Sequence, residues 1–215
     1  MLAEQVVNLT FFGILLSAIP IIAVSTTSFV MISVVFFIVR NAIGIQQTPP
    51  NIVLYALTLI LTAFITAPVV SDVFDRVTDR DLNITTLAQF EDVASDATEP
   101  IRTFLLKRTS EEERRFFIAA TAKVWPPEQA RTVSDTDLII LVPTFVTAEL
   151  NKAFKIGLLL YLPFLIVDLV ISAVLMAMGM IMMSPTIIAV PFKLALFVLV
   201  DGWTRIVQGL ILSYA

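Results

Sequence analysis

Long uncharged stretches flank a polar middle section in this chain, and this arrangement predicts its main elements. Residues 5–39 and 41–71 contain no charged side chain. Of two further apolar stretches, residues 156–183 contain one charged residue and residues 186 to about 213 contain three. A helix needs about 20 apolar residues to cross the hydrocarbon core of a membrane, and all four stretches exceed this length. The pattern predicts two hydrophobic helical segments at each end of the chain.

Short polar segments separate the two members of each pair. The segment RNAIGIQQTPPN, residues 40–51, contains Arg40, a glycine and two prolines before the next apolar run. Proline cannot continue a helix but suits the first turn of the next one, and Ser184-Pro185 provides a similar signal in the second pair. We therefore expect an all-α fold with hydrophobic helical hairpins over residues 1–71 and 156–215.

The polar section, residues 72–155, is expected to form a mainly helical domain between the hairpins. In TSEEERRFFIAATA, Ser110 and Glu113 have the spacing of a capping box, which predicts a helix over about 111–124 with a solvated charged face. Two prolines that follow Trp125 end this helix. A second, amphipathic helix is expected to run from about Thr144 into the third apolar stretch.

The composition supports a membrane protein and excludes several kinds of chemistry. Hydrophobic residues make up 58% of the chain and its mean hydropathy is +0.92, whereas globular proteins have roughly 45–50% apolar residues. There is no cysteine and no histidine, which removes the common catalytic triads and zinc motifs, and no glycine-rich phosphate loop occurs. A net charge of −4 without a basic cluster argues against nucleic acid as a partner. We expect a protein that is not an enzyme and has no cofactor or metal.

The start of the chain lacks one mark of a secretory signal peptide. It begins MLAEQVVNLTFF, with Glu4 and no lysine or arginine before the apolar run. The positively charged first region of a signal peptide is therefore missing, and we expect the segment to be retained.

Charged residues inside the last two apolar stretches require partners. Asp168 lies in the middle of the third stretch, while Lys193, Asp201 and Arg205 lie in the fourth. A central Asp or Lys costs roughly 2.5–3.5 kcal/mol on insertion scales, so these charges need protein around them. Glu149, at the end of the polar section, is a further polar candidate.

A straight hairpin does not bring the opposite charges together. With the turn near Ser184-Pro185 and about 1.5 Å rise per residue, Asp168 lies roughly 25 Å from the tip and Lys193 roughly 13 Å. Asp201 is level with Asp168, but these two residues have the same charge. We hypothesise that Lys193 of one copy pairs with Asp168 of a neighbouring copy, which makes the protein an obligate oligomer.

Methionine is concentrated in one octet, MAMGMIMM, at residues 176–183. The chain has seven methionines, and outside this octet only Met1 and Met31 remain. The methionine side chain is flexible and polarizable, so it suits irregular or changing contacts. Two interpretations follow: an apolar ring that closes an aperture by dewetting, or ordinary lipid-facing and core residues at a helix end.

Three segments resemble one protein family. RNAIGIQQTPPN at 40–51, FKIGLLLYLPFLIVDLVISAVLMAMGM at 154–180 and PTIIAVPFKLALFVLVDGW at 185–203 are similar to the bacterial type III secretion export-gate protein that is called FliP in flagella and SctR in injectisomes. The similarity covers both apolar ends. The short length and the absence of a signal-like start favour the injectisome branch.

The resemblance implies a ring-like helical assembly in the bacterial inner membrane that projects to the periplasmic side, with the polar domain on that side. Its expected partners are further copies of the chain, in a pentamer, and two other small hydrophobic export-gate proteins, FliQ/SctS-like and FliR/SctT-like. The larger export-gate and switch membrane proteins, unfolded secreted substrates and membrane lipid complete the expected contacts. Much of the apolar helical surface would then face protein rather than lipid.

The resemblance also assigns the methionine octet a role, as a gasket around the export path. The matching tip residues are Met180, Ile181, Met182 and Met183, where the family more commonly has three consecutive methionines before Val-Pro-Pro. The buried Asp and Lys of the family match Asp168 and Lys193. The implied function is a protein-conducting export pore that limits leakage.

Two other functions remain open on the residues alone. Asp168 and Asp201 are also compatible with a proton or cation site in a transporter of small solutes or ions. An intramembrane aspartyl protease would use the same two acids, although VDGW differs from the Gly-x-Gly-Asp setting of such enzymes.

Overall fold

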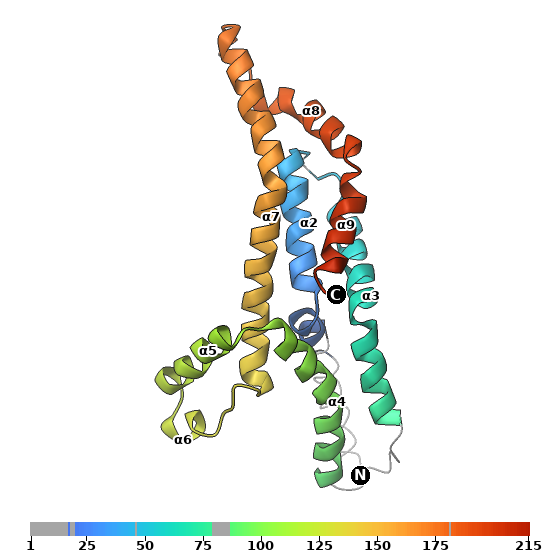
Figure 1. The fold of residues 1–215 in the computed structure, drawn as a ribbon, viewed down its shortest axis with the longest axis vertical. Coiled ribbons are helices and arrows are strands. Elements are labelled where there is room, and N and C mark those ends of the chain that lie inside the picture. Colours follow the sequence, from blue (N-terminus) through green and yellow to red (C-terminus); the bar gives the residue numbers. More distant parts are fainter. Residues whose placement is uncertain (1–16, 18–19, 46, 79–86, 181) are drawn as a thin grey trace, which may run out of the picture. The chain divides into compact units, whose positions relative to one another are not determined.

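A computed structural model describes residues 17, 20–45, 47–78, 87–180 and 182–215, without the side chains of residues 87–94. All regular secondary structure in these residues is helical (Figure 1). After a short helical segment, Pro20–Thr26, the helices are α2 (Phe29–Ile43), α3 (Asn51–Thr78), α4 (Leu87–Arg108), α5 (Glu111–Val124), α6 (Pro127–Ala130), α7 (Leu138–Ala177), α8 (Pro185–Leu199) and α9 (Gly202–Leu212). The predicted all-α fold with apolar helices is confirmed for this part of the chain. The expected retention of the first residues and the position of Ile181 lie outside the described residues.

The chain divides into two compact units, and each is described by itself. The first comprises Met1–Val30 and Thr66–Ala148, and the second comprises Met31–Ile65 and Glu149–Ala215. Helices α3 and α7 contribute one end to each unit. The expected division by polarity, at residues 71 and 155, follows a different criterion and stays a prediction.

In the first unit, helix α5 forms where the capping box predicted it. The Glu113 backbone N–H donates to the Ser110 hydroxyl oxygen at 3.3 Å, and the Glu113 carboxylate accepts from the Ser110 backbone N–H at 2.9 Å. The helix ends at Val124, directly before Trp125 and the two prolines. The reciprocal bonds satisfy two backbone N–H groups that a helix start otherwise leaves without partners.

Helix α7 begins at Leu138, about two turns before the expected start near Thr144. The backbone N–H groups of Ile140 and Leu141 donate to the Asp137 carbonyl at 2.9 Å, so helical bonding is established from the first residues. Leu141 and Phe145 then join Leu105 in a buried apolar cluster. The helix starts earlier than expected because the apolar residues before Thr144 also pack into the core of this unit.

In the second unit, helix α2 is the central element. It is apolar on nearly all sides, and such a helix is stable only when it is covered. Its side chains contact three other helices: Phe36 lies 5.9 Å from Trp203 of α9 and Phe37 lies 5.3 Å from Tyr55 of α3, as ring centroids. Against α7 the packing leaves no room for a side chain at Gly157, because an added Cβ would lie 2.4 Å from Ile38.

The turn between α2 and α3 is held by Arg40. Its guanidinium group donates to the Asn51 side chain and to the Pro49 carbonyl, and it lies 5.0 Å above the Phe37 ring. Gly44 and Gln47 in this turn have positive φ angles of 83° and 68°. The polar tip predicted from RNAIGIQQTPPN is therefore present, and its one charged residue is used to close it.

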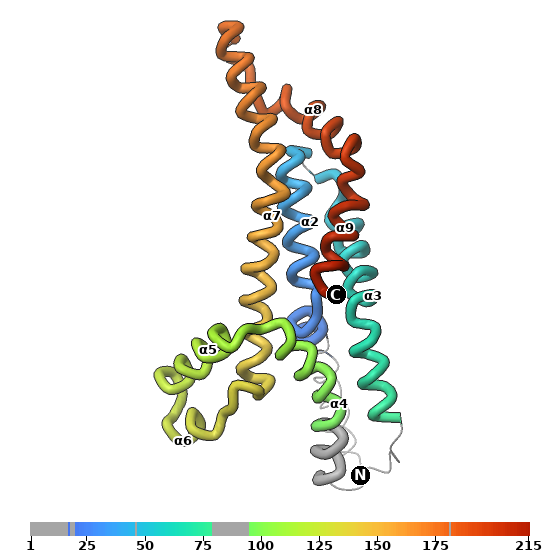
Figure 2. The backbone as a smooth tube through the Cα atoms, viewed as in Figure 1, coloured from blue at the N-terminus to red at the C-terminus, as the bar shows by residue number. Residues whose placement is uncertain are grey.

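The fourth apolar stretch is two helices rather than one. Helices α8 and α9 are bent by 60° at a break around Asp201, whose φ angle is +51° (Figure 2). The first residue of α9 is Gly202. Glycine is needed here because a Cβ would lie 2.2 Å from the Phe197 ring. The Asp-Gly pair is a turn signal, and here it marks the break.

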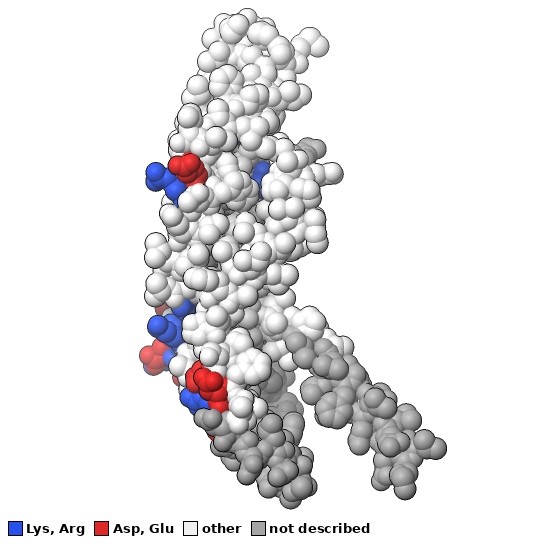
Figure 3. All heavy atoms as spheres, turned by 90° about the vertical axis from the view of Figure 1, so that its right-hand side faces the viewer, with Lys and Arg blue, Asp and Glu red and all other residues white. Residues whose placement is uncertain are grey.

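Helices α3 and α7 are each long and apolar enough to cross a membrane. Up to four spans result if each bent pair, Pro20–Thr26 with α2 and α8 with α9, counts as one. In Figure 3 charged side chains gather in a few small groups, and broad uncharged surface lies between them. Many exposed side chains of α3, α7 and α8 are large and apolar, so lipid or other protein is needed to cover them.

Candidate functional site

A buried ion pair joins α7 and α8 in the second unit. The ammonium nitrogen Nζ of Lys193 lies 2.6 Å from Oδ2 of Asp168, and the Lys193 side chain is only 3% exposed. The same nitrogen donates to the backbone carbonyl of Ala42, at the end of α2, at 3.0 Å. One cation therefore connects three helices and is neutralised by a carboxylate, which offsets much of the cost of burying it.

The prediction that these two charges lie too far apart to pair within one chain is wrong. The estimate placed the turn at Ser184-Pro185, whereas α7 ends at Ala177 and the following residues are not helical. Measured from the actual helix ends, Asp168 lies about 14 Å before the end of α7 and Lys193 about 12 Å after the start of α8. The two residues are level, so this pair does not need a neighbouring copy.

The remaining charges of the last apolar stretch lie at the break between α8 and α9. Asp201 and Arg205 both have exposed side chains. Asp168 is partly exposed, yet its second oxygen, Oδ1, is buried and has no hydrogen-bond partner among the described residues. A functional role for Asp201 and Arg205 stays a prediction.

Glu149 belongs to a second buried polar group, at the C-terminal end of the chain. Its carboxylate accepts a hydrogen bond from the Tyr214 hydroxyl, which also lies 3.5 Å from the sulfur of Met31. Lys152, one turn further along α7, donates to the Ser213 carbonyl at 3.0 Å and lies 4.8 Å from the Tyr214 ring. These contacts fix the last residues of the chain against α7.

The methionine-rich tip begins with a specific helix ending. Gly179 has a φ of +75°, and its N–H donates to the Met176 carbonyl at 3.0 Å. The Met180 N–H donates to the Leu175 carbonyl at 2.9 Å. These two bonds with a left-handed glycine form a Schellman motif, which stops the helix and turns the chain away from its axis.

The tip presents its thioethers to the surroundings. Met176, Met178, Met182 and Met183 are exposed, with Met182 completely so, and Met180 is half-buried. The Met183 N–H donates to the Met180 carbonyl at 3.3 Å, and the Ser184 and Thr186 hydroxyl groups lie 3.2 Å apart before α8 continues. The fourth tip residue of the prediction, Ile181, is outside the described residues. Backbone hydrogen bonds thus hold Gly179, Met180 and Met183, while the Met182 side chain is fully exposed.

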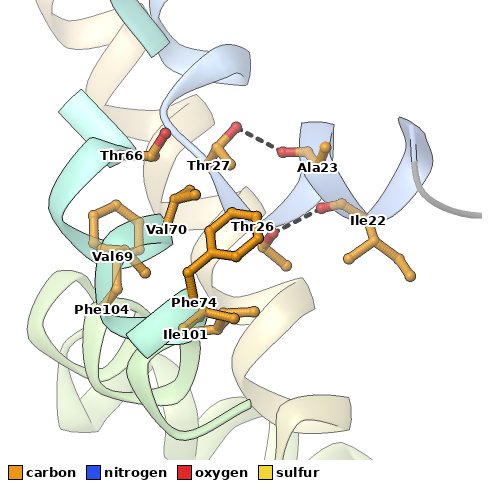
Figure 4. Close-up of a pocket in the computed structure, with 11 residues that line it drawn as sticks. Ile22, Ala23, Thr26, Thr27, Thr66, Val69, Val70, Phe74, Ile101 and Phe104 are labelled. Atoms are coloured by element: carbon orange, nitrogen blue, oxygen red, sulfur yellow. Dashed lines mark hydrogen bonds between the residues drawn. The ribbon is translucent and has the colours of Figure 1, made fainter. Parts of the chain in front are cut away.

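The first unit contains an apolar pocket of about 260 Å³ between Pro20–Thr26, α3 and α4 (Figure 4). Thr26 and Thr27 line it, but their hydroxyl groups donate to backbone carbonyls of their own segment at 2.8 and 2.6 Å. Phe74 and Phe104 supply much of the remaining wall. Because the pocket presents hardly any polar group to a ligand, it offers no catalytic or ionic chemistry.

Sequence reasoning missed several members of these sites. Tyr214, Lys152 and the Ala42 carbonyl carry contacts that no local pattern indicates, since their partners are distant in the chain. The end of α7 had a usable signal in Gly179, which lies among residues that otherwise favour a helix. The described residues contain no cluster of three acidic side chains that could hold a metal ion.

Together, the long apolar helices and the buried Lys193–Asp168 ion pair define a membrane protein that is all-helical over the described residues. The model of the FliP family matches residues 13–210. The chain belongs to the FliP family.

Curated relatives support this assignment along nearly the whole chain. The chain is 55% identical over 191 residues to "Probable translocation protein y4yL" of Sinorhizobium fredii, covering 89% of this chain and 86% of the relative. It is 44% identical over 208 residues to "Yop proteins translocation protein R" of Yersinia pestis, covering 97% and 96%. It is 40% identical over 212 residues to "Hypersensitivity response secretion protein HrcR" of Ralstonia nicotianae, covering 96% of each. These relatives agree with the injectisome branch that the sequence resemblance indicated.

Proposed function

We propose that the chain is a core component of a type III secretion export gate and forms part of its protein-conducting pore. The observation that carries this proposal is membership of the FliP family over nearly the full length, with relatives whose names describe translocation and secretion. The chain itself brings no nucleotide-binding motif, so the energy for export comes from another component. Its task is to build the conduit and to keep it closed when no substrate passes.

In this proposal several copies, five by the family resemblance, assemble with FliQ/SctS-like and FliR/SctT-like proteins in the bacterial inner membrane. The larger export-gate and switch membrane proteins adjoin the ring, which projects to the periplasmic side. Exposed apolar residues along α7 and α8, among them Leu159, Ile166 and Leu199, support such an assembly because so much apolar surface requires cover.

The methionine-rich tip is the proposed gasket. Met180, Ile181, Met182 and Met183 from each copy would surround the export path and exclude water and ions. The exposed thioethers of the tip support this role, because flexible apolar side chains close an aperture and still deform around an unfolded substrate.

The Lys193–Asp168 contact argues against a transporter and against an aspartyl protease. Both use Asp168 as an ion site or as a catalytic acid. Its carboxylate already contacts the Lys193 ammonium group at 2.6 Å, which supplies the countercharge that an ion or proton would otherwise provide.

The test replaces Met180, Met182 and Met183 by alanine in the complete export gate. Shorter side chains leave a wider, wettable aperture, so we expect ion conductance across a planar bilayer to rise at least about tenfold while secretion continues. Met176→Ala, an exposed methionine within α7 and before the tip, is the matched control and should leave the conductance unchanged. Unchanged conductance in the triple variant would contradict the gasket.

A further inference from the structure

Among the described methionines, Met31 lies in a very different environment from the exposed methionines near the end of α7. Met31, in the central helix α2, is completely buried, and its sulfur lies 3.5 Å from the Tyr214 hydroxyl. The thioethers of Met176, Met178, Met182 and Met183 are exposed, and Met182 has no cover from the rest of the chain. One protein therefore carries a protected methionine and a cluster of accessible ones, and reagents that attack thioethers will distinguish them.

Hydrogen peroxide is such a reagent. A lone pair of the methionine sulfur attacks one peroxide oxygen, an S–O bond forms and the O–O bond breaks. The proton on the transferred oxygen passes to the departing hydroxide, which leaves as water. Sulfur is oxidised by two electrons, the peroxide is reduced, and methionine sulfoxide and water are the products. The reaction needs access to the sulfur from water, so its rate follows exposure.

The fold tolerates this reaction at the tip. The turn after α7 is held by the Gly179 and Met180 backbone N–H groups and by the Met183 N–H, and none of these bonds uses a methionine side chain. Met178, Met182 and Met183 can therefore gain an oxygen without loss of a hydrogen bond in the described residues. At Met31 the same change would place a polar oxygen in the packed centre of the second unit.

We infer that Met182 and Met183 form an oxidation-sensitive site at which peroxide converts methionine to sulfoxide and thereby opens the closed export path to ions. The sulfoxide oxygen accepts hydrogen bonds from water and has a large dipole, so an aperture closed by apolar contact becomes wettable. Methionine sulfoxide reductases, one for each epimer of the sulfoxide, reverse the change. This inference rests on the proposed function, because a leak follows only if the tip closes the path.

The first measurement locates the modification. The purified export gate, reconstituted in liposomes, is treated with hydrogen peroxide, and the peptides that contain Met31 and residues 176–183 are compared by mass spectrometry over time. We expect oxidation in the tip peptide to be at least about tenfold faster than at Met31. Equal rates for the two peptides would overturn the inference.

The second measurement links the modification to the seal. Peroxide should raise the ion conductance of the wild-type gate, and the two reductases should restore it. The variant with Met180→Leu, Met182→Leu and Met183→Leu keeps apolar side chains of similar volume without sulfur, so it should stay closed before and after peroxide. Met31→Leu is the matched control and should respond as the wild type does.

Failure of the inference and failure of the proposed function give different results. If the triple alanine variant leaks but full oxidation of the tip leaves the wild type closed, the inference is wrong and the gasket stands. If the triple alanine variant does not leak, the gasket and the leak on oxidation are both wrong. The selective reaction at residues 176–183 is then decided by the peptide measurement alone.

Discussion

Lys193 donates a hydrogen bond to the backbone carbonyl of Ala42, 151 residues earlier in the chain, at 3.0 Å. This contact differs from the ion pair with Asp168. The carbonyl oxygen carries only a partial negative charge, whereas the Asp168 carboxylate carries a full one. The lysine is therefore specific in two ways: it needs a carboxylate on α7 and an acceptor at the end of α2. A cationic donor satisfies both contacts at once.

Replacing Lys193 by methionine tests the stabilising role of the pair. The substitution leaves the partly buried Asp168 carboxylate without its cation, which destabilises by about 3 kcal/mol, the low end for buried pairs because Asp168 is 27% exposed. For a chain of this size we expect the midpoint of thermal unfolding in detergent to fall by roughly 6–12 °C. Lys155→Met, an exposed lysine on α7, should leave the midpoint unchanged.

Exchanging the two charges separates the ion pair from the carbonyl contact. In the double variant Asp168→Lys, Lys193→Asp, attraction between the two side chains returns, but a carboxylate faces the Ala42 carbonyl. We expect the double variant to recover less than half of the stability that is lost when Lys193 alone is replaced. Complete recovery of the unfolding midpoint would show that the Ala42 contact contributes nothing.

Tyr214→Phe tests the Glu149–Tyr214 hydrogen bond, which holds the last residues of the chain against α7. The variant removes the hydroxyl that donates to the buried Glu149 carboxylate, and hydrogen bonds to charged groups contribute about 1.5–3 kcal/mol. We expect a lower unfolding midpoint and faster amide hydrogen exchange in α9. Tyr161→Phe, at a half-buried tyrosine on α7, provides the control. Equal effects of the two variants would count against a stabilising role of the Glu149–Tyr214 hydrogen bond.

Two glycines provide a matched test of the turn after α7. Gly179 and Gly209 each have no atom within 4 Å of an added Cβ, but only Gly179 has a positive φ, of +75°. Gly179→Ala should therefore destabilise by about 1–2 kcal/mol through backbone strain. Gly209→Ala, inside α9, should be neutral or stabilise by about 0.5–1 kcal/mol, because it reduces the freedom of the unfolded chain. Denaturant titrations in detergent would measure the change in unfolding free energy for both variants.

Close packing of α2 on α7 gives a fifth prediction. Gly157→Ala places a Cβ 2.4 Å from Cδ1 of Ile38, and such overpacking costs about 1–3 kcal/mol. Ile38→Val removes that Cδ1 atom, so the double variant should recover part of the loss in a double-mutant cycle. Additive effects of the two substitutions would place the helices further apart than the structure does.

Local signals predicted those features that depend on neighbouring residues. The capping box of Ser110 and Glu113 fixed the start of α5, and the prolines after Trp125 fixed its end, because the interacting groups lie within one helical turn. The all-α class followed from the length of the apolar stretches. Such features require no knowledge of tertiary contacts.

Features that depend on distant residues were not predictable in the same way. The end of α7 at Ala177 depends on the left-handed conformation of Gly179, in a run whose composition favours a continued helix. That one difference moved the level of Asp168 relative to Lys193 and led to the mistaken hypothesis of a pair between copies. The Glu149–Tyr214 contact joins residues 65 positions apart, and no pattern in the sequence indicates it.

The 40-residue length of α7 has a consequence for how the chain sits in a membrane. At about 1.5 Å per residue the helix is about 60 Å long, twice the roughly 30 Å thickness of the hydrocarbon layer. The whole helix would fit inside this layer only if its axis were tilted by about 60° from the membrane normal. Observed tilts of membrane helices range from about 0 to 40°. Even at 40°, about 20 Å of α7 extends beyond the hydrocarbon layer, so the apolar side chains on that length must be covered by protein rather than by lipid.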